Sequence, residues 1–381
     1  MGPRIDFFPQ PSSAIGSKMH PLMLSLATKF SHPPNSPLDS QRALMLRLAR
    51  TWLWLFVVAA TLTVHANAQN ATTHAFLWSS TSGMQDLGSL GGGGSYGNGI
   101  NNAGQVVGYY VTSGGTDRAF LWTSGGGMQD LGTLGGDFAI ASGINSTGQV
   151  VGAANTASGE VHAFLWTAAS GMQDLGTLGG ASSSAVAIND LGDVTGSASQ
   201  AGDIRVVAFR QTPPEKMYGL GTLGYRYSYG YGINAAATVV GASPLNKNLN
   251  PSHAFIRRKG SHMVDLGTLG GDNSAAFGIS QSEQVVGWAS LNGFLPFHAF
   301  LWTQGTGMQD LGTLGGQNSS GLAINGKSQI VGFSDLSQTV THAALWTPPN
   351  QIQDLGTLGG NYAVAQGVND LGQVVGWSTL Q

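Results

Sequence analysis

Residues 118–152 read RAFLWTSGGGMQDLGTLGGDFAIASGINSTGQVVG, and this pattern recurs seven times between residue 74 and the end of the 381-residue chain. The spacing between copies is 44 to 46 residues, and the copies begin at His74, Arg118, His162, Val207, His253, His298 and His342. A period of this length suits a propeller blade of four short strands. One unit cannot bury its own apolar faces, so the copies must stack on one another.

The unit divides into four expected strands. Residues 162–166 (HAFLW) are apolar on both faces, and residues 172–178 (MQDLGTL) follow as a second strand that the Gly-Gly pair at 179–180 ends. Small residues at alternate positions, as at 139, 141 and 143, indicate a strand in a crowded place near a central axis. An Asn-containing hairpin then leads into the Val-rich strand QVVG. From the axis outward the blade is therefore A (AxGIN), B (QVVG), C (HAFLW) and D (MQDLGTL).

The two ends of the repeat region favour a closed ring. The first copy begins with strands C and D (residues 74–90), and the last ends with strands A and B (residues 363–378). Pairing these halves completes a seventh blade and removes an exposed sheet edge. We therefore predict an all-β fold, a seven-bladed β-propeller with four-stranded blades. An open β-solenoid is the alternative, but it would need polar caps at its ends.

Composition limits the class of protein. The chain is 41% apolar and 9% charged, with 58 Gly and no Cys, so it is globular and has neither disulfides nor thiolate metal sites. After residue 68 there are 10 Lys and Arg against 17 Asp and Glu, a net charge of −7. A chain that is acidic over most of its surface is not a general nucleic-acid binder.

The N-terminal region has the pattern of an export signal. Three arginines (Arg42, Arg47 and Arg50) precede an apolar run of 14 residues at 51–64, and Ala66-Asn67-Ala68 supplies a cleavage site. Fourteen residues are short for a membrane span, which needs about 20, although a retained anchor is the alternative. We predict a leader or misassigned start at 1–44, a signal peptide at 45–68 and the propeller at 69–381. The protein would be secreted or periplasmic, with no stable membrane insertion after cleavage.

The recurring motifs resemble the extracellular HAF-repeat family of bacterial proteins. The resemblance rests on His-Ala-Phe-Leu-Trp, Asp-Leu-Gly-Thr-Leu-Gly-Gly and Ile-Asn-x-x-Gly-Gln-Val-Val-Gly, and it covers about 310 residues. It implies export from a bacterium and implies no known activity or catalytic residue. Copies four and five depart from the pattern, with Gly219 in place of Asp, Arg210 and Arg257 in place of Trp, and Val207 in place of His.

Several residue types recur in nearly every copy, and we interpret them as structural. The Asp set would accept backbone N–H bonds at a Gly-rich turn, and one carboxylate per blade is too few for Ca²⁺. The His set lies too far from the axis to share a metal ion, and the Trp set is expected to pack between blades. The Asn set suits hairpin turns, with a polar ring at one mouth of the channel as the alternative. These sets are Asp86, Asp130, Asp174, Asp265, Asp310 and Asp354; His74, His162, His253, His298 and His342; Trp78, Trp122, Trp166, Trp302 and Trp346; and Asn101, Asn145, Asn189, Asn234, Asn325 and Asn369.

Internal symmetry breaks between residues 205 and 259, where a site for an asymmetric ligand is most expected. Eight of the ten Lys and Arg after residue 68 lie there against Glu215 alone, a local charge of +7 with −14 elsewhere. Topology places Lys216, Arg258 and Lys259 on one face of the propeller. It places on the other face the candidate binding residues Arg205, Tyr225, Arg226, Tyr227 and Lys247, which could stack on sugar rings and bind anionic groups. In the other interpretation the tyrosines only fill space in a decayed repeat.

Motifs for catalysis are missing from the sequence. It has no Gly-x-Ser-x-Gly, His-Glu-x-x-His or phosphate loop, and strand A offers no paired carboxylates, so we predict no enzyme, cofactor or metal. The expected function is that of a binding or surface-interaction module for a glycan, a cell-envelope polymer or another protein. A structural repeat protein and a propeller glycoside hydrolase or lyase are the alternatives.

Overall fold

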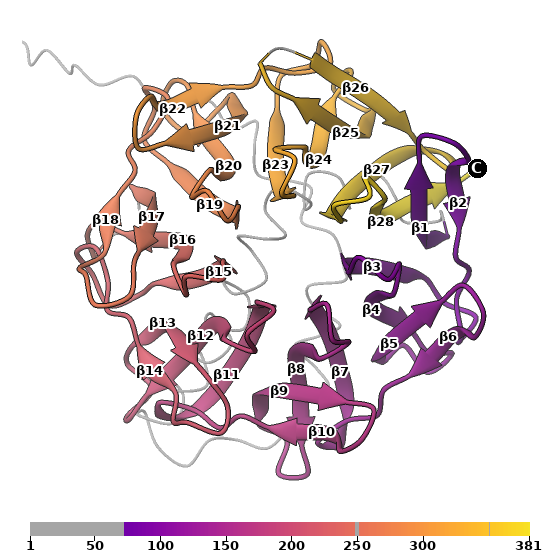
Figure 1. Ribbon diagram of the computed structural model, residues 1–381, viewed down its shortest axis with the longest axis vertical. Helices are drawn as coiled ribbons and strands as arrows, with labels where there is room; N and C mark the ends of the chain where they lie inside the picture. Colours follow the sequence, from indigo (N-terminus) through magenta and orange to yellow (C-terminus); the bar gives the residue numbers. More distant parts are fainter. Residues whose placement is uncertain (1–71, 248–250, 350) are drawn as a thin grey trace, which may run out of the picture. The chain divides into compact units, whose positions relative to one another are not determined.

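The computed structural model describes residues 72–247, 251–349 and 351–381, and these residues form strands joined by loops. The predicted leader and signal segments lie outside this part of the chain. No helix in the described part is long and apolar enough to cross a membrane. Hydrogen bonding groups the strands into seven antiparallel sets of four, which are arranged as a ring around a central axis (Figure 1). The prediction of an all-β propeller is confirmed.

Six blades follow one another along the chain, and each runs from the axis outward. The first three are β3 (Ser95–Ile100), β4 (Val106–Val111), β5 (Asp117–Thr123) and β6 (Gly127–Asp130); β7 (Gly135–Ile144), β8 (Val150–Thr156), β9 (Val161–Thr167) and β10 (Gly171–Asp174); and β11 (Gly179–Ile188), β12 (Val194–Gln200), β13 (Val206–Gln211) and β14 (Tyr218–Gly219). The next three are β15 (Tyr229–Ile233), β16 (Val239–Pro244), β17 (Ser252–Arg257) and β18 (Val264–Asp265); β19 (Ser274–Ile279), β20 (Val285–Ser290), β21 (Phe297–Thr303) and β22 (Gly307–Asp310); and β23 (Ser319–Ile324), β24 (Ile330–Asp335), β25 (Thr341–Thr347) and β26 (Gln351–Gly356).

The seventh blade closes the ring with strands from both ends of the repeat region. It consists of β27 (Gly359–Val368), β28 (Val374–Leu380), β1 (Thr73–Ser79) and β2 (Gly83–Asp86). β28 pairs with β1 over six residue pairs, from Thr73 with Thr379 to Trp78 with Val374. The predicted pairing of N-terminal strands C and D with C-terminal strands A and B is confirmed. A single parallel bridge between Thr341 and Tyr362 links this blade to the sixth.

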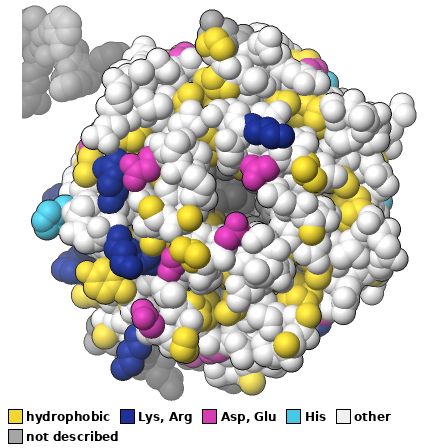
Figure 2. Space-filling view, in the orientation of Figure 1, with side chains coloured by type: hydrophobic (Ala, Val, Ile, Leu, Met, Phe, Trp, Pro, Cys, Tyr) yellow, Lys and Arg dark blue, Asp and Glu magenta, His cyan; other side chains and the backbone are white. Residues whose placement is uncertain are grey.

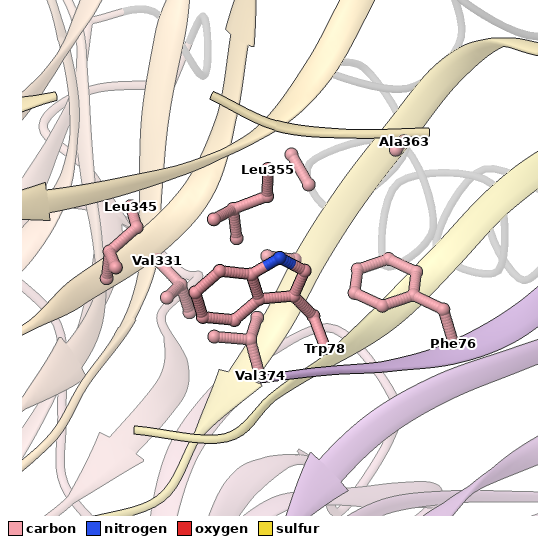
Figure 3. Close-up of a cluster of buried hydrophobic side chains, with 9 residues drawn as sticks. Phe76, Trp78, Val331, Leu345, Leu355, Ala363 and Val374 are labelled. Atoms are coloured by element: carbon pink, nitrogen blue, oxygen red, sulfur yellow. The ribbon is translucent and has the colours of Figure 1, made fainter. Parts of the chain in front are cut away.

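The core lies between neighbouring blades. Figure 3 shows Phe76 and Trp78 of β1 in contact with side chains from the sixth and seventh blades, among them Val331, Leu345 and Val374. Phe76 is fully buried, and burying one such side chain stabilises a fold by about 1.5–3 kcal/mol. The recurring Phe and Trp therefore hold adjacent blades together, as the sequence indicated.

Small residues in the innermost strands are explained by the approach of the next blade. A Cβ atom added to Gly143 would lie 3.0 Å from the carbonyl oxygen of Val186 in β11. The same position in β3 is Gly99, where an added Cβ would lie 3.4 Å from the Cα of Gly143. The crowded place that the sequence predicted is therefore the contact between innermost strands of adjacent blades.

Two details of the predicted unit were wrong. The outermost strand ends at Asp174 instead of Leu178, because the Asp174 carboxylate accepts a hydrogen bond from Gly176 N–H (2.7 Å) and Gly176 has a φ of +74°. In the fourth copy the Trp position is occupied by Gln211, since Gln211 pairs with Val194 as Trp166 pairs with Val150. Arg210 stands at the preceding Leu position.

Candidate functional site

The recurring His and Asp residues form pairs within five of the seven blades. Nδ1 of His162 lies 2.7 Å from the Asp174 carboxylate, and four other blades repeat this contact at 2.8–2.9 Å: His74 with Asp86, His253 with Asp265, His298 with Asp310, and His342 with Asp354. The third blade has Val207 and Gly219 at these positions, so both partners are lost together. The structural interpretation of the His set and of the Asp set is confirmed. The pairing of the two sets was not predicted from the sequence, although the fourth copy lacks both the His and the Asp.

The first blade replaces the His with Arg118. Its guanidinium lies 2.8 Å from Asp130, which also accepts a hydrogen bond from the Tyr110 hydroxyl (2.7 Å). Partial burial alone would raise the pKa of Asp130, but the bonds from Arg118, Tyr110 and Gly132 N–H bring it below its ordinary value. Burial and the neighbouring carboxylate raise the pKa of Tyr110 to about 12. This cluster is therefore a charged structural contact at pH 7.

The His and Asp side chains of different blades do not converge. In the described part of the chain, no group of three or more His, Asp or Glu side chains could hold a metal ion. Asp190 and Asp370 follow the Asn in their hairpins and are used between blades, since Asp190 accepts a bond from Ser146 N–H (2.9 Å) and Asp370 accepts one from Gly326 N–H (2.8 Å).

The recurring Asn residues form a ring of hydrogen bonds from blade to blade. Nδ2 of Asn145 donates to the main-chain oxygen of Asn189 (3.2 Å), while its Oδ1 accepts N–H bonds within its own hairpin. Asn369 bonds to Asn101 (3.0 Å) across the closure of the ring. All six Asn side chains are at most 5% exposed, so the alternative of a polar ring at the channel mouth was wrong. The fifth blade has Ser280 at this position and lacks the donor.

The five predicted binding residues lie in three connections of the third and fourth blades. Arg205 is exposed in the β12–β13 connection, Tyr225, Arg226 and Tyr227 lie between β14 and β15, and Lys247 is exposed after β16. Main-chain contacts link these loops: Tyr227 forms a bridge with Val206, and its carbonyl oxygen accepts a bond from the Ser243 hydroxyl (2.8 Å). We call the residues Arg205, Tyr225, Arg226, Tyr227 and Lys247 the loop site.

Aromatic and cationic groups alternate in the loop site. The Arg226 guanidinium lies 5.9 Å from the centre of the Tyr225 ring, and the rings of Tyr225 and Tyr227 meet edge to face at 5.8 Å. Arg226 is exposed and both tyrosines are half-buried. The arrangement places partly exposed aromatic rings beside a cation, a combination that can bind a sugar ring and an anionic substituent together.

The other tyrosines of the same stretch serve a different purpose. Tyr229 and Tyr231 lie in β15 with stacked rings 6.4 Å apart, and Tyr231 is only 8% exposed. Tyr231 packs against Ala275 and Trp288 of the fifth blade. The space-filling interpretation therefore holds for these two residues, while Tyr225 and Tyr227 stay partly open to solvent.

Two arginines outside the loop site are bound to neighbouring blades. Figure 2 shows Lys and Arg side chains gathered on one side of the ring, over the third and fourth blades. Arg258 forms an ion pair with Glu283 of the fifth blade (2.7 Å), and this bond lowers the pKa of Glu283. Arg210 donates to the main-chain oxygen of Ala237 (3.3 Å) in the next blade. These two arginines link blades and are not free for a ligand.

Comparisons with known proteins give only distant likenesses. No protein-family model and no curated protein matches the sequence. Similar solved structures include a protein assigned as TolB from Agrobacterium tumefaciens (8% identity, TM-score 0.49, 82% of this chain and 99% of that chain). They also include a lectin from Burkholderia pseudomallei (9%, 0.42, 74% and 94%) and a gluconolactonase from Xanthomonas campestris (9%, 0.39, 81% and 97%). These proteins differ in activity, and at TM-scores below 0.5 they assign no function to this chain.

Proposed function

We propose that the protein is an exported, non-enzymatic binding module and that its loop site recognises an anionic glycan or another anionic polymer of the cell envelope. The observation that carries this proposal is the break in symmetry. The residues shared by the blades make contacts that every blade needs, whereas Arg226 and its two tyrosines occur once and lie at the surface. Their charge is positive in a chain that is otherwise acidic. Export is supported by the apolar run at 51–64 and by the resemblance to HAF-repeat proteins.

Binding is favoured over hydrolysis because the loop site has no free carboxylate pair. Asp203 is the acidic residue nearest to it in sequence on the same connection, and its carboxylate accepts a hydrogen bond from Ala181 N–H (2.8 Å). A glycoside hydrolase needs two carboxyl groups that flank the scissile bond. A protein partner that carries acidic groups would meet the same cationic surface and is the outcome to consider if no polymer binds.

The test is a binding screen with the purified chain against anionic and neutral polysaccharides, namely alginate, polygalacturonate and dextran. The double variant Arg226→Ala/Tyr227→Ala should bind the anionic polymers at least about tenfold more weakly, equivalent to about 1.4 kcal/mol. A matched control, Lys216→Ala/Lys259→Ala, removes two cations from the other face and should stay within twofold. Added salt should weaken binding, because exposed charges are screened.

Three outcomes would reject the proposal. Equal binding by the loop-site variant and the unmodified chain would place the ligand elsewhere. Shortening of either anionic polymer during incubation would show an enzyme. A mature N-terminus other than one near Gln69, or retention of the chain in the bacterial cytoplasm, would contradict export.

A further inference from the structure

A β-bulge interrupts the innermost strand of every blade at the same place. In the second blade Ala141 pairs with Gly152 and Gly143 with Val151, which leaves Ser142 between them without a partner. The same shift in the other blades leaves one extra residue in each, and the seven bulge residues are Asn98, Ser142, Val186, Tyr231, Phe277, Leu322 and Gln366. A bulge recurring at one position re-aims a side chain and is a designed feature of a fold.

The bulge residues differ in every copy, although their surroundings do not. All seven are different amino acids, whereas the residues immediately before and after them are only Gly or Ala. Contacts between innermost strands explain the small flanking residues, as at Gly143. Packing therefore restricts the flanks and leaves the bulge position free to carry a specific chemistry.

The bulge residues belong to the strands that surround the axis. Each innermost strand contacts the innermost strands of the blades on either side, so the seven form a closed ring (Figure 1). Val186, Tyr231 and Phe277 come from three successive blades and share one cluster, and the rings of Tyr231 and Phe277 are 5.2 Å apart. Side chains of three blades therefore meet in one cluster, which also includes Trp288 and Phe297 of the fifth blade. Six of the seven bulge residues are half-buried, and Tyr231 alone is buried.

Their chemistry divides the ring into two arcs. Val186, Tyr231, Phe277 and Leu322 follow one another in the third to sixth blades and form an apolar arc. Gln366, Asn98 and Ser142 follow in the seventh, first and second blades and form a polar arc without charge. Asn98 donates to the main-chain oxygen of Ala141 (2.8 Å), which leaves its amide oxygen as an acceptor, and Gln366 makes no side-chain hydrogen bond with described residues.

We propose that the bulge residues form an axial site for a neutral saccharide. A sugar ring has an apolar C–H face, which can lie on Phe277 and Leu322, and the buried Tyr231 ring packs against Phe277. Its hydroxyl groups can reach the amide groups of Gln366 and Asn98, which both donate and accept. Since no bulge residue is charged, neither arc offers an ion pair to an anionic ligand. The axial site uses none of the loop-site residues and stands independently of the proposed function.

The test uses cellotetraose, maltotetraose and chitotetraose as probes of the full chain, with saturation-transfer NMR and calorimetry. Phe277→Ser and Gln366→Val each introduce a residue that another blade carries at the bulge, so both variants are expected to fold. Each should weaken the binding of at least one probe about tenfold. Tyr218→Ser changes an aromatic residue that is 57% exposed on the outermost strand β14 and should leave binding unchanged. Arg226→Ala/Tyr227→Ala should also leave it unchanged.

The axial site is rejected if none of the three probes gives a signal at millimolar concentration. It is also rejected if both Phe277→Ser and Gln366→Val bind within twofold of the unmodified chain. If Phe277→Ser unfolds, the half-buried Gln366 variant decides alone. Loss of binding in the loop-site variant instead would assign the neutral saccharide to the loop site and overturn the axial assignment.

Discussion

Two opposite exchanges in the Asn ring, Ser to Asn in the fifth blade and Asn to Ser in the seventh, should change the stability of the propeller in opposite directions. The six Asn side chains donate to the next blade at 2.9–3.2 Å. Ser280 cannot reach the fifth-to-sixth seam in this way, so the main-chain oxygen of Asn325 accepts only the bond from Ser328 N–H (3.1 Å). Ser280→Asn would supply the missing donor, and Asn369→Ser would remove the donor that closes the ring.

The expected size follows from one hydrogen bond between buried groups. Such a bond contributes about 0.5–1.5 kcal/mol net. The hairpin bonds should survive both exchanges, because the Ser280 hydroxyl accepts from Gln284 N–H (3.1 Å) as Asn369 Oδ1 accepts from Gln373 N–H (2.9 Å). Ser280→Asn should therefore stabilise the fold by about 1 kcal/mol and Asn369→Ser should destabilise it by about the same amount. Each change corresponds to about 2–4 °C in the melting temperature of a domain of 150–250 residues, and to somewhat less here.

The assay is thermal and urea unfolding of the two variants and of the double variant, followed by circular dichroism. If the seams act independently, the double variant should return close to the unmodified chain. The reasoning fails if Ser280→Asn is neutral or destabilising while Asn369→Ser is also neutral, since the bonds between blades would then contribute nothing measurable. Ser146→Ala controls for effects on the turn itself, because Ser146 is exposed on the equivalent hairpin of the second blade and bonds to Asp190 through its main-chain N–H.

Three further changes test the packing and the charged pairs. Phe164→Ala empties a fully buried position and should lower the free energy of unfolding by about 3–5 kcal/mol in urea denaturation. Gly152→Ala should destabilise the fold by at least about 1–3 kcal/mol, because the new methyl group would collide with the carbonyl oxygen of Ile140; normal urea stability would contradict this contact. Partial burial would raise the pKa of Asp265, but the bonds from His253 and Gly267 N–H lower it, so its stabilising contribution exists above the unfolded pKa of about 4 and is lost as pH falls through the folded value. Asp265→Asn should therefore reduce the loss of melting temperature on acidification; an unchanged pH profile would argue against the pair.

Much of the fold could be predicted because each blade repeats the same requirements. Strand order, the innermost position of AxGIN and the closure by the two ends all follow from the repeat, and the pairing of β1 with β28 confirms them. The outermost strand was predicted too long because Leu175 and Leu178 continue the apolar pattern beyond Asp174, and that pattern does not show where a carboxylate turns the chain. The substitution at the Trp position was misplaced because the fourth copy was aligned by residue type, whereas the ladder with Val194 sets Gln211 opposite it.

The candidate site was only partly accessible from sequence. The face of the propeller that carries the loop site could be predicted, because successive connections between strands alternate between the two faces. The bridge between Val206 and Tyr227 links two of the loops. The sequence could not show that Arg258 is paired with Glu283, because these residues are 25 positions apart in different blades. It also could not separate Tyr225 and Tyr227 from the buried Tyr231, since all three stand in one run of alternating tyrosines.

The distinction between shared and divergent residues connects the two proposed sites. Every position that is nearly constant in the repeat has a contact with a neighbouring blade or turn: the Phe fills the seam, the Asn bonds across it, and the Asp holds its turn. A substitution at such a position lowers the stability of the fold, so these positions are not available to vary for binding a particular ligand. The contacts of the bulge position and of the long connections differ from blade to blade, so a change there does not remove a contact that all blades share. Ligand recognition in a closed ring of similar blades is therefore expected where the copies differ, and in this chain they differ most at the bulge residues and in the loops of the third and fourth blades.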